Sequence, residues 1–124
     1  MKKVMIFSVL TIISSVAMAG YQYTPQVYIN SAGTYARGSM VGAHTSADAI
    51  QRIRCTTEKW TSGSSHTWCS ATNSSGTSVL CSSWNADLVD ATMAIADESY
   101  ISFQLNSSGQ CTHIRIENGS YFKE

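Results

Sequence analysis

The chain is poor in proline and in charged side chains, and it has no excess of basic residues. Proline occurs once, 13% of the residues are charged, and Lys plus Arg equals Asp plus Glu at eight each. A disordered chain carries more charge and less apolar content than the 44% found here, so the composition predicts a folded domain. A general nucleic-acid binder needs a basic surplus to hold a phosphate backbone, and that class is therefore disfavoured.

Standard catalytic and metal-binding motifs are also absent from the sequence. It contains no Gly-x-Ser-x-Gly, no His-Glu-x-x-His and no phosphate-binding loop. His44, His66 and His113 are far apart, and no two cysteines have the Cys-x-x-Cys spacing of a zinc or redox site. The motifs therefore predict no catalytic residue, no metal site and no cofactor.

The first 19 residues have the three parts of a signal peptide. Lys2 and Lys3 form a positive start, residues 4–13 form an apolar run, and Ala17-Met18-Ala19 has the small-x-small form that signal peptidase recognises. The apolar run is shorter than the ~20 residues of a membrane-spanning helix. We expect cleavage before Gly20. The short positive start of two lysines is typical of bacterial signal peptides. Residues 20–124 would then form a single secreted or periplasmic domain with no membrane span.

All four cysteines follow the predicted cleavage site, at positions 55, 69, 81 and 111. An even number in a small exported chain predicts two disulfides, and four cysteines allow three pairings. A hairpin of residues 51–60 with 66–72 would place Cys55 opposite Cys69, which favours Cys55–Cys69 together with Cys81–Cys111. Pairing of Cys69 with Cys81 remains an open alternative.

Most of the exported part has the pattern of short strands separated by turns. Three segments rich in Asn, Ser and Gly, at 61–65, 73–76 and 106–109, predict turns because these residues adopt backbone shapes that others resist. Alternating polar and apolar residues between them predict strands. The predicted strands cover residues 26–30, 34–42, 51–60, 66–72, 77–82, 100–105 and 111–117. The first is expected at a sheet edge, where Pro25 is tolerated.

One helix is predicted at about 84–96, where apolar residues recur at helical spacing. Ser83 or Asn85 can cap its start. Residues 43–50 are ambiguous between a helical turn capped by Ser46 and an extended connection. The expected fold class is α+β, a small antiparallel β-sheet built of hairpins with one packed helix and two disulfides.

The predicted hairpin also gathers a candidate binding face. Strand alternation places Trp60, Trp68, His66, Glu58 and Arg54 on one side of the sheet and Cys55 and Cys69 on the other. Indole rings beside polar groups are typical of surfaces that stack on sugars, and aromatic residues beside arginine are typical of interaction hot spots. The simpler interpretation is that one indole supports the core, and a one-residue slip in register would exchange the two faces.

These features favour a non-enzymatic exported module that binds a protein or a carbohydrate partner. Two alternatives stay open: a small secreted hydrolase that uses carboxylates, and a toxin-like or structural surface protein. Asp87 and Asp90 share one face of the predicted helix, and Asp97 and Glu98 follow its end. We expect these carboxylates to be solvated, because a surface pair lacks the burial that raises a catalytic pKa.

Overall fold

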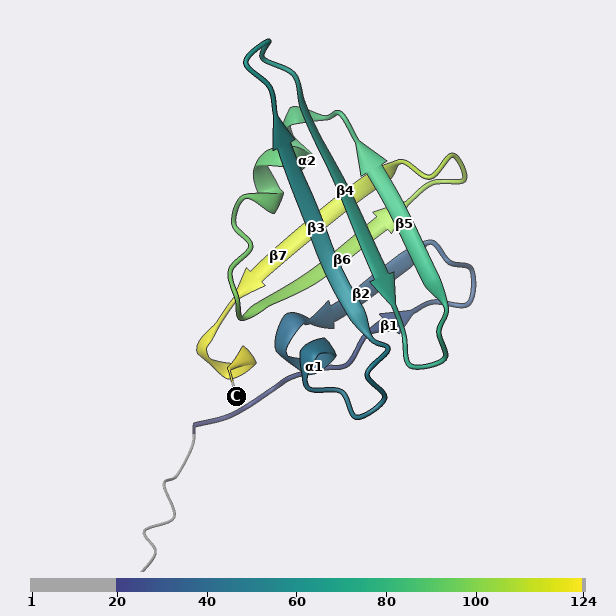
Figure 1. Cartoon of the computed structure of the whole chain (residues 1–124), viewed down its shortest axis with the longest axis vertical. Coiled ribbons are helices and arrows are strands. Elements are labelled where there is room, and N and C mark those ends of the chain that lie inside the picture. The colour runs from purple at the N-terminus through teal and green to yellow at the C-terminus, as the bar shows by residue number, and fades with distance from the viewer. Residues whose placement is uncertain (1–19, 124) are drawn as a thin grey trace, which may run out of the picture.

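The computed structural model describes residues 20–123, so the predicted signal peptide and Glu124 lie outside the described part. Within this part, seven strands, two α-helices and one 3-10 helix make up the fold (Figure 1). In chain order these are β1 (Tyr28–Ile29), β2 (Tyr35–Ser39), α1 (Met40–His44), β3 (Arg52–Lys59), β4 (Ser65–Thr72), β5 (Ser78–Ser83), α2 (Ala86–Thr92), β6 (Ser99–Leu105), β7 (Cys111–Asn118) and η1 (Ser120–Phe122).

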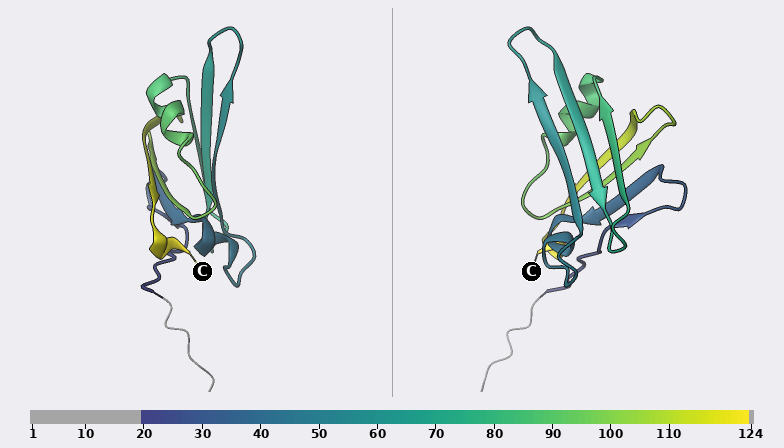
Figure 2. Two further views of the ribbon diagram at one scale, coloured as in Figure 1. Left: turned by 90° about the vertical axis from the view of Figure 1, so that its left-hand side faces the viewer. Right: turned by 45° about the vertical axis from the view of Figure 1, so that its right-hand side comes forward.

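The strands form two antiparallel sheets that lie face to face. One has the order β1-β2-β6-β7 and the other β3-β4-β5, and Figure 2 shows them edge-on as two layers. The α+β class, the antiparallel hairpins and the packed helix are as predicted, but the strands divide between two sheets where one was expected. The chain leaves the four-stranded sheet after β2, through α1, and returns to it after β5, through α2. Each sheet can thereby bury its apolar face against the other.

The predicted turns join the hairpins as expected. Gly63, Gly76 and Gly109 have φ values of 91°, 82° and 75°, in the left-handed region that favours glycine. Asn73 and Asn106 begin two of these turns, and each side-chain oxygen accepts two backbone N–H bonds within its own turn. These turns set the register of the strands on either side.

The core lies between the two sheets and includes the cysteine side chains. Ile101 and Phe103 of β6 are fully buried, as are Cys69 and Val89 on the opposing elements. The disulfides are Cys55–Cys69 and Cys81–Cys111, which confirms the favoured pairing. The first joins neighbouring strands β3 and β4, and the second joins β5 to β7 across the interface between the sheets. None of the helices among residues 20–123 is long and apolar enough to cross a bilayer.

Helix α2 covers a shorter range than the predicted 84–96. Asn85 caps its start, since its side-chain oxygen accepts bonds from the backbone N–H groups of Asp87 and Leu88 at 3.0 and 3.2 Å. After Thr92 the chain turns away, and the Asn118 side chain of β7 donates to the carbonyl of Ala94 at 3.0 Å. Helical spacing alone could not reveal this partner, which lies 24 residues further along the chain.

The other helix, α1, begins inside a range that was predicted as strand. Strand β2 ends at Ser39 rather than residue 42, because the Ser39 hydroxyl accepts a bond from the Gly42 backbone N–H at 2.8 Å and caps the helix. Ser46 follows the helix instead of capping it, and its hydroxyl donates to the carbonyl of Ala43. The ambiguous segment 43–50 is therefore the end of a helix followed by a loop.

Candidate functional site

The hairpin of β3 and β4 has the register that the sequence predicts. Thr56 lies opposite Trp68, Glu58 opposite His66, and Cys55 opposite Cys69. Partners in an antiparallel pair project to the same face, and alternate residues project to opposite faces. Cys69 is fully buried and faces the second sheet. Trp68 and His66 therefore lie on the outer face of the β3–β4–β5 sheet, which is turned toward the viewer in Figure 1.

Four ring side chains meet at one end of this outer face, and we call them the aromatic cluster: Trp60, His66, Trp68 and Trp84. The ring centroids of Trp60 and Trp84 are 5.8 Å apart with 26° between the planes, which is a stacked pair. The His66 ring lies 4.3 Å from Trp84 and 5.6 Å from Trp68. Trp84 is 67% exposed and Trp60 is 45% exposed, so the cluster presents apolar ring surface to water.

Trp84 is a member of this cluster that sequence reasoning missed. The sequence placed it at the start of the predicted helix, whereas β5 continues to Ser83 and α2 begins at Ala86. Ser83 pairs with Thr67, so the next residue comes beside His66 on the outer face. Continuing the strand alternation from Leu80 and Ser82 would have given Trp84 the same orientation.

Arg54 lies on the same face, next to Trp68 and on the side away from Trp60 and Trp84. It pairs with Ser70, two ladder positions beyond the Thr56–Trp68 pair, and its Nε donates to the Ser70 hydroxyl at 3.4 Å. Arg52 lies two positions further, opposite Thr72. An open hollow of about 460 Å³ is formed here by both arginines with side chains of β4 and β5, including Ser70, Thr72, Ser78 and Leu80. The outer face thus has an aromatic end and a basic end.

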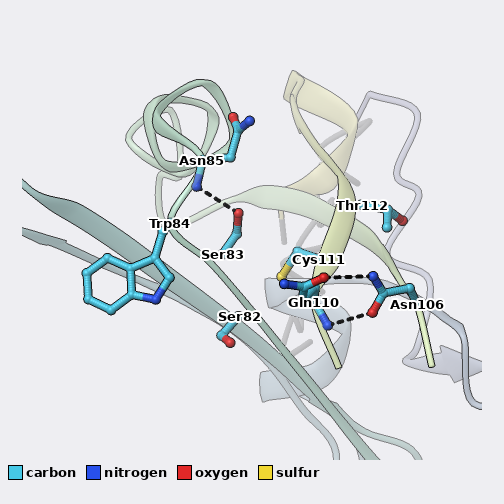
Figure 3. Close-up of a pocket in the computed structure, with 8 residues that line it drawn as sticks. All are labelled: Ser82, Ser83, Trp84, Asn85, Asn106, Gln110, Cys111 and Thr112. Atoms are coloured by element: carbon cyan, nitrogen blue, oxygen red, sulfur yellow. Dashed lines mark hydrogen bonds between the residues drawn. The ribbon is translucent and has the colours of Figure 1, made fainter. Parts of the chain in front are cut away.

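A second hollow, of about 430 Å³, adjoins the aromatic cluster at Trp84 (Figure 3). Its lining is polar and comes from the end of β5, the start of α2 and the turn between β6 and β7. The side-chain amide of Asn106 donates to the Gln110 oxygen at 3.0 Å, and the Ser83 hydroxyl accepts from the Asn85 backbone N–H. An indole beside amide and hydroxyl groups can bind a ligand that is partly apolar and partly hydrogen-bonding.

The carboxylates considered for acid–base chemistry lie elsewhere and are exposed to water. Asp90 projects from α2 and accepts a bond from Lys59 Nζ at 3.0 Å, and Glu98 pairs with Lys123 at 3.3 Å. Asp87 is exposed in the first turn of α2, where the positive end of the helix dipole favours its charge. These positions agree with the expected solvated helix face.

The three histidines lie on three different elements. His44 ends α1, His66 is in β4, and His113 is in β7. Within residues 20–123, no group of three or more His, Cys, Asp or Glu side chains is placed to hold a metal ion. His66 instead contributes its ring to the aromatic cluster.

Comparison with known proteins identifies no relative of this chain. No protein-family model, no curated protein and no solved structure matches the chain.

Proposed function

We propose that this chain is an exported, non-enzymatic recognition module that binds a protein or glycan through the outer face of the β3–β4–β5 sheet. The observation that carries the proposal is the exposure of Trp60 and Trp84 within the aromatic cluster. Large ring side chains contribute most to stability when they are buried, and exposed groups of them mark interaction sites. Export is supported by the two disulfides, which fit an oxidising compartment.

The cluster also provides a direct optical signal for binding. The chain contains three tryptophans, and all of them are in the aromatic cluster. Tryptophan emission therefore reports on this face alone, and a ligand that covers the rings should shift or quench it. Binding can be screened in this way against arrays of oligosaccharides and peptides without any label on the protein.

We expect Trp60→Ala and Trp84→Ala to abolish most binding while leaving the fold intact. Burying about 100 Å² of an indole contributes roughly 2.5 kcal/mol, or about 70-fold in affinity. Loss of an exposed ring should lower the free energy of unfolding by about 1 kcal/mol or less, against roughly 3–5 kcal/mol for a buried one. Affinity is measured on the hits from the arrays, and stability by urea denaturation.

The matched control is Met93→Ala, because Met93 is 61% exposed but lies at the end of α2, away from the sheet face. It should bind as the parent does. Ligands that bind both tryptophan variants with parental affinity would contradict the proposal. A loss of 3 kcal/mol or more in both variants would show that the rings are structural instead.

A further inference from the structure

The outer face of the β3–β4–β5 sheet is polarised in charge along its strands. Arg52 and Arg54 lie at one end of β3, followed on the same face by Thr56 and then Glu58 beside the aromatic cluster. Alternate residues of a strand are about 7 Å apart. The basic end and the aromatic end are thus close enough for one short oligomer to contact both.

The two arginines of the basic end differ from the other cationic side chains in having no charged or aromatic partner. Among residues 20–123, Lys59, Arg115 and Lys123 pair with carboxylates, and Arg37 lies over the Tyr28 ring at 5.2 Å. Arg52 and Arg54 are exposed, and within the described residues they form neither kind of contact. Two neighbouring guanidinium groups repel each other, and a bound anion would relieve that repulsion.

The surroundings of these arginines suit a carboxylate on a sugar. Arginine binds a planar carboxylate with two parallel N–H bonds. The hollow that they help to line also contains Ser70, Thr72 and Ser78. The Thr72 and Ser78 hydroxyls bond to each other at 2.7 Å, and their remaining lone pairs can accept bonds from ring hydroxyls. Trp68 lies on the same face two ladder positions from the Arg54–Ser70 pair, a step that suits the next ring of an oligosaccharide, and it can stack on that ring's C–H face.

Glu58 and the small number of free cations argue against densely charged polymers. A nucleic acid carries a phosphate at every nucleotide, whereas this face offers two free arginines and then a carboxylate. A heavily sulfated glycan meets the same repulsion at Glu58. A chain that alternates acidic and neutral sugars matches the pattern, because the Glu58 carboxylate can accept bonds from the hydroxyls of a neutral ring.

We infer that the outer face of the β3–β4–β5 sheet binds a glycan that contains uronic acid. Its carboxylate lies in the hollow between Arg52 and Arg54, and the adjoining sugar ring stacks on the aromatic cluster. The inference rests on the proposed function and names the chemical class of its ligand.

The test titrates the full exported domain with defined oligosaccharides and follows tryptophan emission. Three carboxylated probes are used, namely hexasaccharides of hyaluronan, alginate and polygalacturonate, together with neutral chitohexaose. The hyaluronan hexasaccharide, which alternates uronic acid with a neutral sugar, should bind at least tenfold more tightly than chitohexaose and more tightly than alginate and polygalacturonate, which carry a carboxylate on every ring. Its affinity should fall as salt increases, because the contact is charged and exposed.

Variants at the basic end separate this inference from the proposed function. Arg54→Gln and Arg52→Gln should each weaken the carboxylated probe about tenfold or more and leave chitohexaose binding unchanged. Trp84→Ala should weaken both kinds of probe. The matched control is Arg115→Gln, which removes the same charge from the other sheet and should have no effect. Melting of each variant is compared with the parent.

Several outcomes would overturn the inference while the proposed function stands. These are equal binding of chitohexaose and the carboxylated probes, no binding of any carboxylated probe beside a peptide that binds through the tryptophans, and tighter arginine-dependent binding of oligo(dT) or of dextran sulfate, a sulfated glycan that has no carboxylate. If Trp60→Ala and Trp84→Ala leave the affinity of every ligand unchanged, both this inference and the proposed function are contradicted.

Discussion

At the scale of single residues, Asp48 organises the loop that follows α1. Its carboxylate accepts bonds from the backbone N–H groups of Ile50 and Gln51 at 2.8 and 3.1 Å and from the Gln51 side-chain amide at 2.6 Å. Gln51 is buried, and its side-chain oxygen accepts from the Val27 backbone N–H at 2.8 Å. One surface carboxylate thus positions the amide that holds the N-terminal segment against the core.

These hydrogen bonds make the contribution of Asp48 depend on pH. The bond from the Gln51 side chain, with those from the Ile50 and Gln51 backbone, lowers the pKa of Asp48 from 3.8 to about 2. Because the pKa is lower in the folded state, the stabilisation is complete above pH 3.8 and is lost as the pH falls toward 2. We expect Asp48→Asn to be less stable than the parent at pH 7, with a difference that shrinks through this range.

Urea denaturation followed by tryptophan emission between pH 7 and about pH 2 measures the difference. Asp97→Asn is the control, since Asp97 is exposed in the turn before β6. A stability difference for Asp48→Asn that stays constant down to about pH 2 would contradict the assignment.

At the scale of elements, the junction between β2 and α1 depends on a close approach of the N-terminal segment. Ser39 is fully buried, caps α1 and donates from its hydroxyl to the carbonyl of Pro25 at 3.1 Å. A Cβ atom on Gly42 would lie 2.6 Å from the carbonyl oxygens of Thr24 and Pro25 and from the Ser39 hydroxyl. Any residue could adopt the helical backbone conformation of Gly42, so glycine is required here by the close packing alone.

Gly42→Ala should destabilise the protein although alanine is the better helix former. Helix propensity alone would stabilise it by about 1 kcal/mol, whereas overpacking against fixed backbone oxygens costs about 1–3 kcal/mol. Because three oxygen atoms would lie 2.6 Å from the new Cβ, the cost should be at the upper end, about 2–3 kcal/mol, and we expect a net loss of about 1–2 kcal/mol in urea denaturation. Val41→Ala, one position earlier in α1, controls for changes in the helix itself. A Gly42→Ala variant as stable as the parent, or more so, would contradict this packing.

At the scale of the whole molecule, the two disulfides have different roles. Cys55 and Cys69 are direct partners in the β3–β4 ladder, so their bond links strands that already pair. Cys81 and Cys111 are 30 residues apart and lie on different sheets. The second bond therefore constrains the packing of the sheets, and with it the position of Trp84 beside the β6–β7 turn.

Replacing Cys81 and Cys111 together by alanine should lower the free energy of unfolding by about 3–4 kcal/mol, because the unfolded chain regains the entropy of the loop that this disulfide closes. The matched double replacement of Cys55 and Cys69 removes a disulfide that closes a loop of 14 residues, and it should lower the free energy of unfolding by about 3 kcal/mol. Urea denaturation compares both with the parent. A Cys81/Cys111 variant that loses less than the Cys55/Cys69 variant would show that the sheets are held together by packing rather than by this bond.

Local signals in the sequence determined the strands, the turns and the register of the β3–β4 hairpin. Strand alternation and the turn residues act between neighbours along the chain, so the positions of Trp68, His66 and Glu58 on one face and the Cys55–Cys69 pair were predictable. The edge position of β1 beside Pro25 followed in the same way. The signal peptide stays a prediction, since it lies outside the described residues.

Contacts between distant segments were decided only by the tertiary structure. The early end of α2 depends on Asn118, the start of α1 at Met40 depends on Ser39 and the N-terminal segment, and the division into two sheets depends on mutual burial of their apolar faces. The length of β5 was decided in the same way: its pairing with β4 as far as Ser83 means that Trp84 continues the strand alternation and does not begin the helix. Helical spacing and strand alternation describe one segment at a time, whereas these boundaries are set by partners that only folding brings together.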